Sequence, residues 1–199
     1  MKKLLALATA FALCPVANAA TVFSDNFDAN ATGLNAVPTG WTVSSGTVDI
    51  IGNGFFDLIP GSGKYIDLDG STSDAGVLAK TLSLVAGTHY TAFFDLAGNH
   101  RNGATETVTG IFGIGLGNVS ATYSLAQNAG WTHYSLSFTP TTTQNYVLSF
   151  SNFGGDNVGM LLDNVSVVST APVPEPETYA MMLAGLGLLA LIRRRRRIA

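Results

Sequence analysis

The sequence predicts an all-β fold, a jelly-roll β-sandwich of about ten strands, flanked by an N-terminal signal peptide and a short C-terminal transmembrane helix. Between residues 21 and 169 no stretch has a sustained helical period. Short segments rich in Val, Ile, Phe, Tyr and Thr instead alternate with clusters of Gly, Asn, Asp and Ser. Many short strands separated by such turn-forming clusters are typical of a β-sandwich.

The expected strands lie where β-branched and aromatic residues gather. In chain order they are Val22–Phe27, Val48–Ile51, Tyr65–Leu68, Val77–Val85, His89–Leu96, Thr107–Leu116, Ala121–Leu125, Thr132–Phe138, Tyr146–Phe150 and Met160–Val168. Alternation within a strand assigns its faces. Tyr90, Ala92, Phe94 and Leu96 share one face, which predicts an apolar stripe that faces the core.

The first 19 residues have the three zones of a secretory signal peptide. Lys2 and Lys3 precede an apolar run, and Ala17 and Ala19 form a small-residue cleavage site. We expect the Sec export machinery to carry the chain and signal peptidase to cleave it after Ala19. The single cysteine, Cys14, would leave with the leader, so the mature chain would have no thiol.

The rest of the chain divides into a β-sandwich domain over residues 20–170, a proline-rich linker over 171–178, a transmembrane helix over 179–192 and a basic tail over 193–199. Fourteen helical residues span about 21 Å, less than the ~30 Å hydrocarbon core, so the helix is a marginal anchor in the inner membrane. The stop signal is the run Arg193, Arg194, Arg195, Arg196 and Arg197. Arginines next to a membrane segment stay cytoplasmic, which directs the domain outward.

The C-terminal segment resembles a known sorting signal. Pro174, Glu175 and Pro176 are followed by a short apolar segment and the arginine cluster, and this order at the end of the chain resembles the PEP-CTERM signal of Gram-negative bacteria that make extracellular polysaccharide. The resemblance implies that an exosortase, a membrane-embedded cysteine protease or transpeptidase, recognises Pro174, Glu175 and Pro176. It places the protein on the cell surface or in the extracellular, biofilm-type matrix.

Charge excludes one class of partner. Residues 21–170 contain three basic and eleven acidic residues, a net charge of −8. Because nucleic-acid binding needs a basic surface that neutralises phosphates, we expect no nucleic-acid partner.

Asp163 is the most informative carboxylate, because it is in phase with Leu161, Val165 and Val167 and is therefore expected to point inward. A carboxylate in an apolar interior must be hydrogen-bonded, paired or bound to a cation. The short motifs SDNFD, YIDLDG and MLLDNVSV, with a strand that begins at Trp131, resemble the galactose-binding-like jelly rolls common among carbohydrate-binding modules.

That resemblance implies a candidate structural calcium ion, held by Asp25 or Asp28 together with Asp163, and backbone carbonyls and Asp69 are the candidates to complete the set. Calcium requires six to eight oxygen ligands, and the sequence has no regular calcium-loop spacing. Hydrogen bonds from backbone amides or a tyrosine to Asp163 are the alternative. No other cofactor is expected.

No catalytic residues are expected. There is no G-x-S-x-G motif, the mature chain has no cysteine, and the three histidines lack metal-ligand spacing. Asn99, His100 and Arg101 form the most polar loop and could bind sugar hydroxyls, and Trp41 and Trp131 could supply stacking surface. The alternatives are a simple hairpin connection and core aromatics.

The expected function is that of a non-catalytic module that binds extracellular carbohydrate or exopolysaccharide. A structural or adhesive matrix protein without a small ligand is the alternative, and a glycoside hydrolase is a more distant one.

The sorting motif gives a direct test. Replacing Pro174 and Glu175 by alanine should leave export intact but block processing at the C-terminus, because the extended proline-rich motif distinguishes this tail from an ordinary anchor. Immunoblotting of cell fractions from an exosortase-containing host measures both events. Unchanged processing of the double variant would mean that the segment is only a linker.

Overall fold

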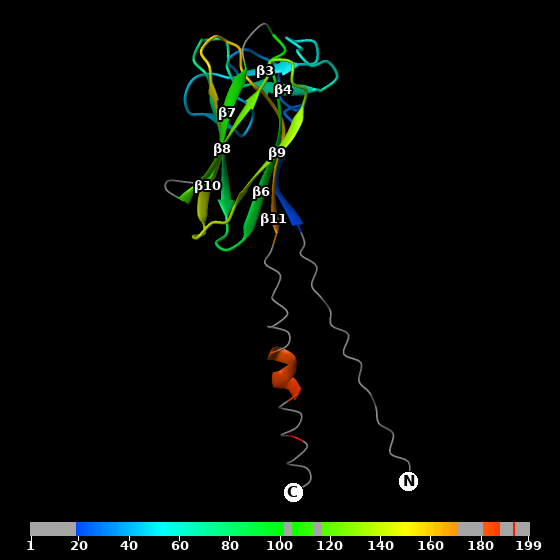
Figure 1. The fold of residues 1–199 in the computed structure, drawn as a ribbon, viewed down its shortest axis with the longest axis vertical. Helices are drawn as coiled ribbons and strands as arrows, with labels where there is room; N and C mark the ends of the chain where they lie inside the picture. Colours follow the sequence, from blue (N-terminus) through cyan, green and yellow to red (C-terminus); the bar gives the residue numbers. More distant parts are fainter. Residues whose placement is uncertain (1–18, 102–104, 114–116, 171–180, 188–192, 194–199) are drawn as a thin grey trace, which may run out of the picture. The chain divides into compact units, whose positions relative to one another are not determined.

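The computed structural model describes residues 19–101, 105–113, 117–170, 181–187 and 193. Residues 19–171 form one compact unit. In its described part, eleven strands lie in two facing sheets, which Figure 1 shows as two layers. The prediction of an all-β sandwich is confirmed.

Every strand pairing is antiparallel. One sheet has the order β3 (Asp49–Gly52), β4 (Lys64–Asp67), β11 (Leu161–Thr170), β6 (His89–Ala97) and β9 (Thr132–Phe138), and β1 (Ala19–Asp25) pairs with β11. The other has the order β2 (Thr42–Val43), β5 (Val77–Leu84), β10 (Gln144–Phe153), β7 (Glu106–Gly113) and β8 (Val119–Leu125). We call them the six-stranded and the five-stranded sheet.

The core lies between the sheets and follows the predicted alternation. On β6, Ala92, Phe94 and Leu96 are fully buried. Phe94 meets Phe150 of β10 edge to face, with ring centroids 4.9 Å apart, so the two aromatic side chains join the sheets. Phe112 of β7 and Phe138 of β9 make a second contact between the sheets, at 5.3 Å. The aromatic residues of the alternating strands are thus largely structural.

A β-bulge in β11 changes the predicted direction of Asp163. Pairing with β6 shifts by one residue between Asp163 and Ser166, and Asn164 has a φ of 50°. Leu162, Val165 and Val167 therefore all belong to the sandwich core, whereas Asp163 lies on the opposite side of the sheet. Asp163 is 4% exposed, so burial was predicted correctly, but its direction was wrong because the bulge resets the alternation.

The predicted strand at residues 107–116 ends at Gly113 in the structure, and residues 114–116 lie outside the described residues. The chain is helical over residues 181–187, within the predicted membrane segment 179–192. Across the part of the chain that the structure describes, no helix has the length and apolar character needed to cross a membrane. Residues 1–18 of the predicted leader, the PEP motif and four of the five arginines lie outside the described residues, whereas Ala19 begins β1.

The contact between the sheets predicts a large effect on stability. Phe94→Ala should lower the free energy of unfolding by about 3–5 kcal/mol, because it removes a buried ring and leaves a cavity between the sheets. Phe153→Ala is the matched control, since Phe153 lies on β10 but is 61% exposed, and it should change stability by less than about 0.5 kcal/mol. Urea denaturation measures both, and equal effects would contradict the assigned core.

Candidate functional site

The side of the six-stranded sheet that faces away from the core carries the candidate site, and we call it the outer face. On β6, Thr91, Phe93 and Asp95 point to this side because they alternate with core residues. Strand register places Phe93 between Ser135 of β9 and Ser166 of β11. Phe93 is thus flanked on the outer face by small hydroxyl side chains.

A stacked pair of rings lies on the outer face, on β6 and the edge strand β9. Phe93 and His133 lie nearly parallel, with an interplanar angle of 12° and centroids 5.5 Å apart. The His133 side chain is 63% exposed, and its Nδ1 lies 2.7 Å from Asp95 Oδ1. Asp95 Oδ2 accepts a 3.0 Å hydrogen bond from the Asn164 amide. Asp95 therefore orients both an imidazole and an amide beside the Phe93 ring.

One end of the outer face is covered by the β3–β4 loop. Ile51, Tyr65, Ala97 and Leu161 form a second buried cluster there. The Tyr65 hydroxyl accepts hydrogen bonds from the backbone amides of Leu58 and Ile59 in this loop. Burial raises the pKa of Tyr65 to about 12, so the hydroxyl keeps its proton. The loop is thereby held over the sheet.

Trp131 lies against this covered end, two residues before His133. Its ring meets Tyr65 edge to face at 5.5 Å, and its Nε1 donates a hydrogen bond to the Ser62 hydroxyl. Trp131 is half-buried. The predicted stacking residue thus belongs to the covered end of the outer face, and its ring already contacts protein there.

Trp41 lies elsewhere, against the expectation of an exposed ring. It is 5% exposed in the core, between Phe23 and Phe27, and its Nε1 donates to Asp25 Oδ2. A ring buried in this way has no face free for a sugar. The alternative, a core aromatic, describes Trp41.

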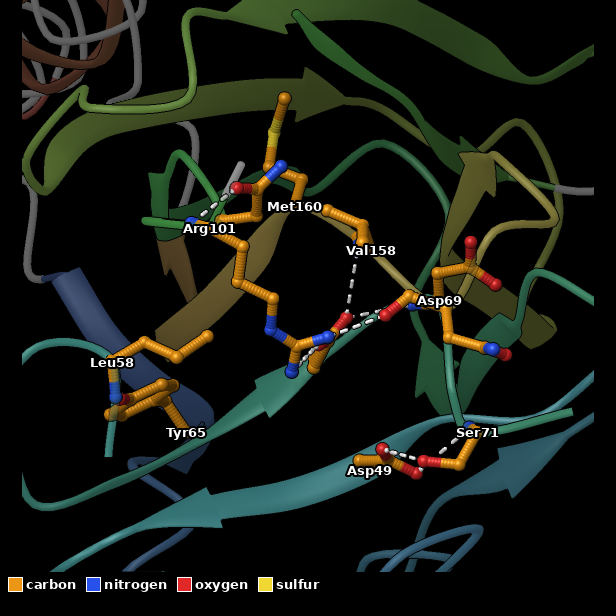
Figure 2. A network of polar contacts seen from close by, with 12 residues as sticks. Asp49, Leu58, Tyr65, Asp69, Ser71, Arg101, Val158 and Met160 are labelled. Carbon is orange, nitrogen blue, oxygen red and sulfur yellow. Dashed lines mark hydrogen bonds and ion pairs between the residues drawn. The ribbon is translucent and has the colours of Figure 1, made fainter. Parts of the chain in front are cut away.

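The predicted binding loop belongs to a polar network at the end of the sandwich (Figure 2). The Arg101 guanidinium lies 3.0 Å from Asp67 Oδ2 and also donates to the backbone carbonyl of Asn157. Asn99 is fully buried, accepts from the Arg101 amide and donates to Glu106. These contacts connect the end of β4 with the loops after β6 and β10. Asn99 and Arg101 therefore stabilise the fold.

His100 is exposed beside this network. Its φ is 52°, and its ring nitrogen Nε2 lies 3.2 Å from the carbonyl oxygen of Ala129. Its own amide donates to Gln127. The structure does not bring His100 to the stacked pair.

Buried carboxylates fasten the segment between β10 and β11. Asp67 Oδ1 accepts from the amides of Asp69 and Gly159, and Asp69 Oδ2 accepts from those of Gly155 and Asp156. Both side chains are fully buried. Asp69 therefore serves this loop and does not join Asp25, Asp28 and Asp163.

The remaining predicted calcium ligands lie near one another. Asp28, Asp95 and Asp25 act electrostatically on Asp163, and together with burial they raise the pKa of its carboxyl to about 7. Asp163 Oδ1 accepts from the Asn164 amide, and both oxygens of Asp25 and of Asp28 also accept hydrogen bonds.

In the described part of the chain, no three His, Cys, Asp or Glu side chains are grouped so that they could hold a metal ion. Calcium stays a prediction, which calorimetry with and without a chelator would test, because an ion bound only by the native state raises the melting temperature.

Comparisons with known proteins agree with the architecture. Residues 20–168 match the family model described as "Protein of unknown function (DUF642)", and residues 172–197 match the PEP-CTERM protein-sorting motif. No match was found among curated proteins.

Solved structures with the same fold include two carbohydrate-binding modules and an adhesin domain. The CBM22-1 xylan-binding domain of Xyn10C from Paenibacillus barcinonensis has a TM-score of 0.55 at 13% identity, over 79% of this chain and 99% of that one. The C-terminal family 22 module of Clostridium thermocellum Xyn10B has 0.52 at 11%, over 78% and 96%. The K3 adhesin domain of Lys-gingipain from Porphyromonas gingivalis has 0.52 at 17%, over 76% and 99%.

The buried carboxylates predict how stability depends on pH. Burial raises the pKa of Asp67 to about 8, that of Asp163 to about 7 and that of Glu106 above its usual range, whereas the unfolded chain has ordinary values of about 4. The folded state therefore binds more protons between pH 4 and 8, and the free energy of unfolding should fall as the pH rises through this window.

The melting temperature should accordingly be higher at pH 5 than at pH 8.5, as calorimetry can measure. Asp163→Asn, which cannot ionise, should flatten part of this slope. A melting temperature that rises from pH 5 to pH 8.5 would contradict the assignment.

Proposed function

This chain belongs to the DUF642 family, and we propose that its β-sandwich is a non-catalytic module that binds extracellular carbohydrate through the outer face of the six-stranded sheet. The fold is shared by xylan-binding and adhesin domains, so it permits the function without establishing it. The support comes from the chemistry of the outer face.

The observation that carries the proposal is the Phe93–His133 stack beside Asp95 and Asn164, in which His133 is exposed and Phe93 is half-buried. A sugar ring has an apolar C–H face that packs on a flat aromatic surface, and hydroxyls at its edge that need donors and acceptors. Here Asp95 and the side-chain carbonyl of Asn164 offer acceptors, and contacts within the protein hold both side chains in place. An arrangement ordered before binding loses less conformational entropy when the ligand arrives.

The same surface argues against hydrolysis. Glycosidases use two carboxyl groups that flank the scissile bond, one of them a general acid with a raised pKa. Asp95 and Asp163 are paired across β6 and β11, and the pKa of Asp163 is raised to about 7. Yet Asp163 is only 4% exposed, and its Oδ1 accepts a hydrogen bond from the backbone amide of Asn164. Asp163 therefore does not face a ligand on the sheet.

The sorting motif supports the cellular part of the proposal. The Sec machinery would export the chain, signal peptidase would remove residues 1–19, and an exosortase would process the tail at the inner membrane of a Gram-negative-type bacterium. The module would then lie at the cell surface or in the matrix, in contact with exopolysaccharide. A matrix spacer or adhesive without a glycan ligand is the rival, and binding measurements separate the two.

Phe93→Ala and His133→Ala should each weaken glycan binding by roughly tenfold or more, because either change removes half of the stack. Phe153→Ala is the matched control: it removes an exposed aromatic ring from the five-stranded sheet and should leave binding unchanged. Glycan-array screening of the full chain, followed by affinity electrophoresis, measures these effects, and circular dichroism checks that each variant folds.

Two results would contradict the proposal. Wild-type protein that binds no glycan would favour the matrix spacer. Binding that depends on Phe153 rather than Phe93 would place the site on the other sheet.

A further inference from the structure

The cations of the sandwich are already engaged by protein groups. Residues 21–170 contain three basic residues. The Lys64 ammonium donates to the carbonyls of Asp28 and Asn30, and the Lys80 ammonium donates to the carbonyl of Gly40 and lies over the Phe23 ring. Arg101 is paired with Asp67. Each of the three charged groups thus already has a partner within the protein.

Negative charge instead surrounds the stacked pair. Asp95 contacts His133 directly. Asp163 on β11 is the cross-strand partner of Asp95. Asp25 and Asp28 are close enough to act electrostatically on Asp163, and like charges are what raise a carboxyl pKa beyond the effect of burial. Asp28 is exposed. A ligand on the stack therefore meets the carboxylate of Asp95, with Asp25 and Asp28 nearby, and Asp163 adds its charge only as the pH rises through about 7.

The domain as a whole is also acidic, because residues 21–170 have a net charge of −8. The summed charge of a protein attracts ligands of opposite sign and repels those of the same sign. A polysaccharide rich in uronate or sulfate would be repelled both at long range and at the stack. An ammonium group on a sugar would be attracted, could donate hydrogen bonds to Asp95, and could lie over an aromatic face.

We infer that the outer face selects a cationic polysaccharide, one whose sugars carry free amino groups, over neutral and acidic glycans. The inference rests on the proposed carbohydrate binding and names the ligand class of that same surface. The stack would bind the apolar face of the sugar, and the carboxylate of Asp95, 20% exposed, would accept from the ammonium.

Three hexasaccharides of equal length test the inference: glucosamine, N-acetylglucosamine and galacturonate. Titration calorimetry of the full chain at pH 6 and low salt should give the tightest binding for the glucosamine hexamer, by roughly tenfold over the acetylated one, and none for the galacturonate hexamer. Added salt should weaken glucosamine binding most, because salt screens exposed charges.

Asp95→Asn should remove most of the preference for glucosamine over N-acetylglucosamine. Asp74→Asn is the matched control, since it removes the same charge from an exposed position in the β4–β5 loop and should keep the preference. Because Asp95 also orients His133, its effect is judged on the ratio of the two affinities rather than on either alone.

The outcomes separate the inference from the proposed function. If the acetylated or acidic hexamer binds as tightly as glucosamine, or if Asp74→Asn removes the preference as fully as Asp95→Asn does, the inference is overturned while carbohydrate binding stands. If none of these hexamers and no array glycan binds, both fail.

Discussion

The bulge at Asn164 is the constraint on which the rest of the outer face depends. β11 pairs with β4, β6 and β1, and the bulge shifts its register against β6. The bulge keeps Val165 and Val167 in the core while it turns Asp163 to the other side. It also exposes the Asn164 side chain, whose amide reaches Asp95. Asparagine tolerates positive φ better than most residues, which suits this position.

Buried polar groups hold the loops at the end of the sandwich that contains Asp67 and Arg101. Burying a carboxylate costs free energy unless hydrogen bonds and an ion pair offset that cost. Asp67 accepts two backbone hydrogen bonds and pairs with Arg101, so its charge is compensated. The compensation is incomplete, since burial still raises its pKa to about 8. The loops are thus held in place by a network whose stability depends on protonation.

The sequence predicted the strands and the core well, because alternation of apolar and polar residues is a local property. Thr132–Phe138 is observed with the predicted bounds, and the stripe from Tyr90 to Leu96 is buried. The Phe93–His133 pair was missed, because it depends on which residues of β6 and β9 lie opposite each other. The one local signal was that Phe93 and Asp95 alternate with the core stripe, which leaves an aromatic ring and a carboxylate together on the other face.

Other expectations failed for reasons that a single strand cannot reveal. Asp163 is out of phase with Val165 because of the bulge, and Trp41 is buried by Phe23 and Phe27 from a distant segment. Asn99 and Arg101 look available in sequence because loops are usually exposed. Buried partners, Glu106 and Asp67, engage both of them.

The central claim is that the outer face of the six-stranded sheet contacts sugar, and an NMR titration tests it most directly. Heteronuclear spectra of the isotope-labelled chain, recorded as a bound oligosaccharide is added, report on each residue separately. The account predicts that shifts concentrate at Phe93, Asp95, His133 and Asn164, while Thr109, Thr122 and Ser149 on the five-stranded sheet stay unchanged. Shifts confined to the five-stranded sheet, with the Phe93 and His133 signals unmoved, would contradict it.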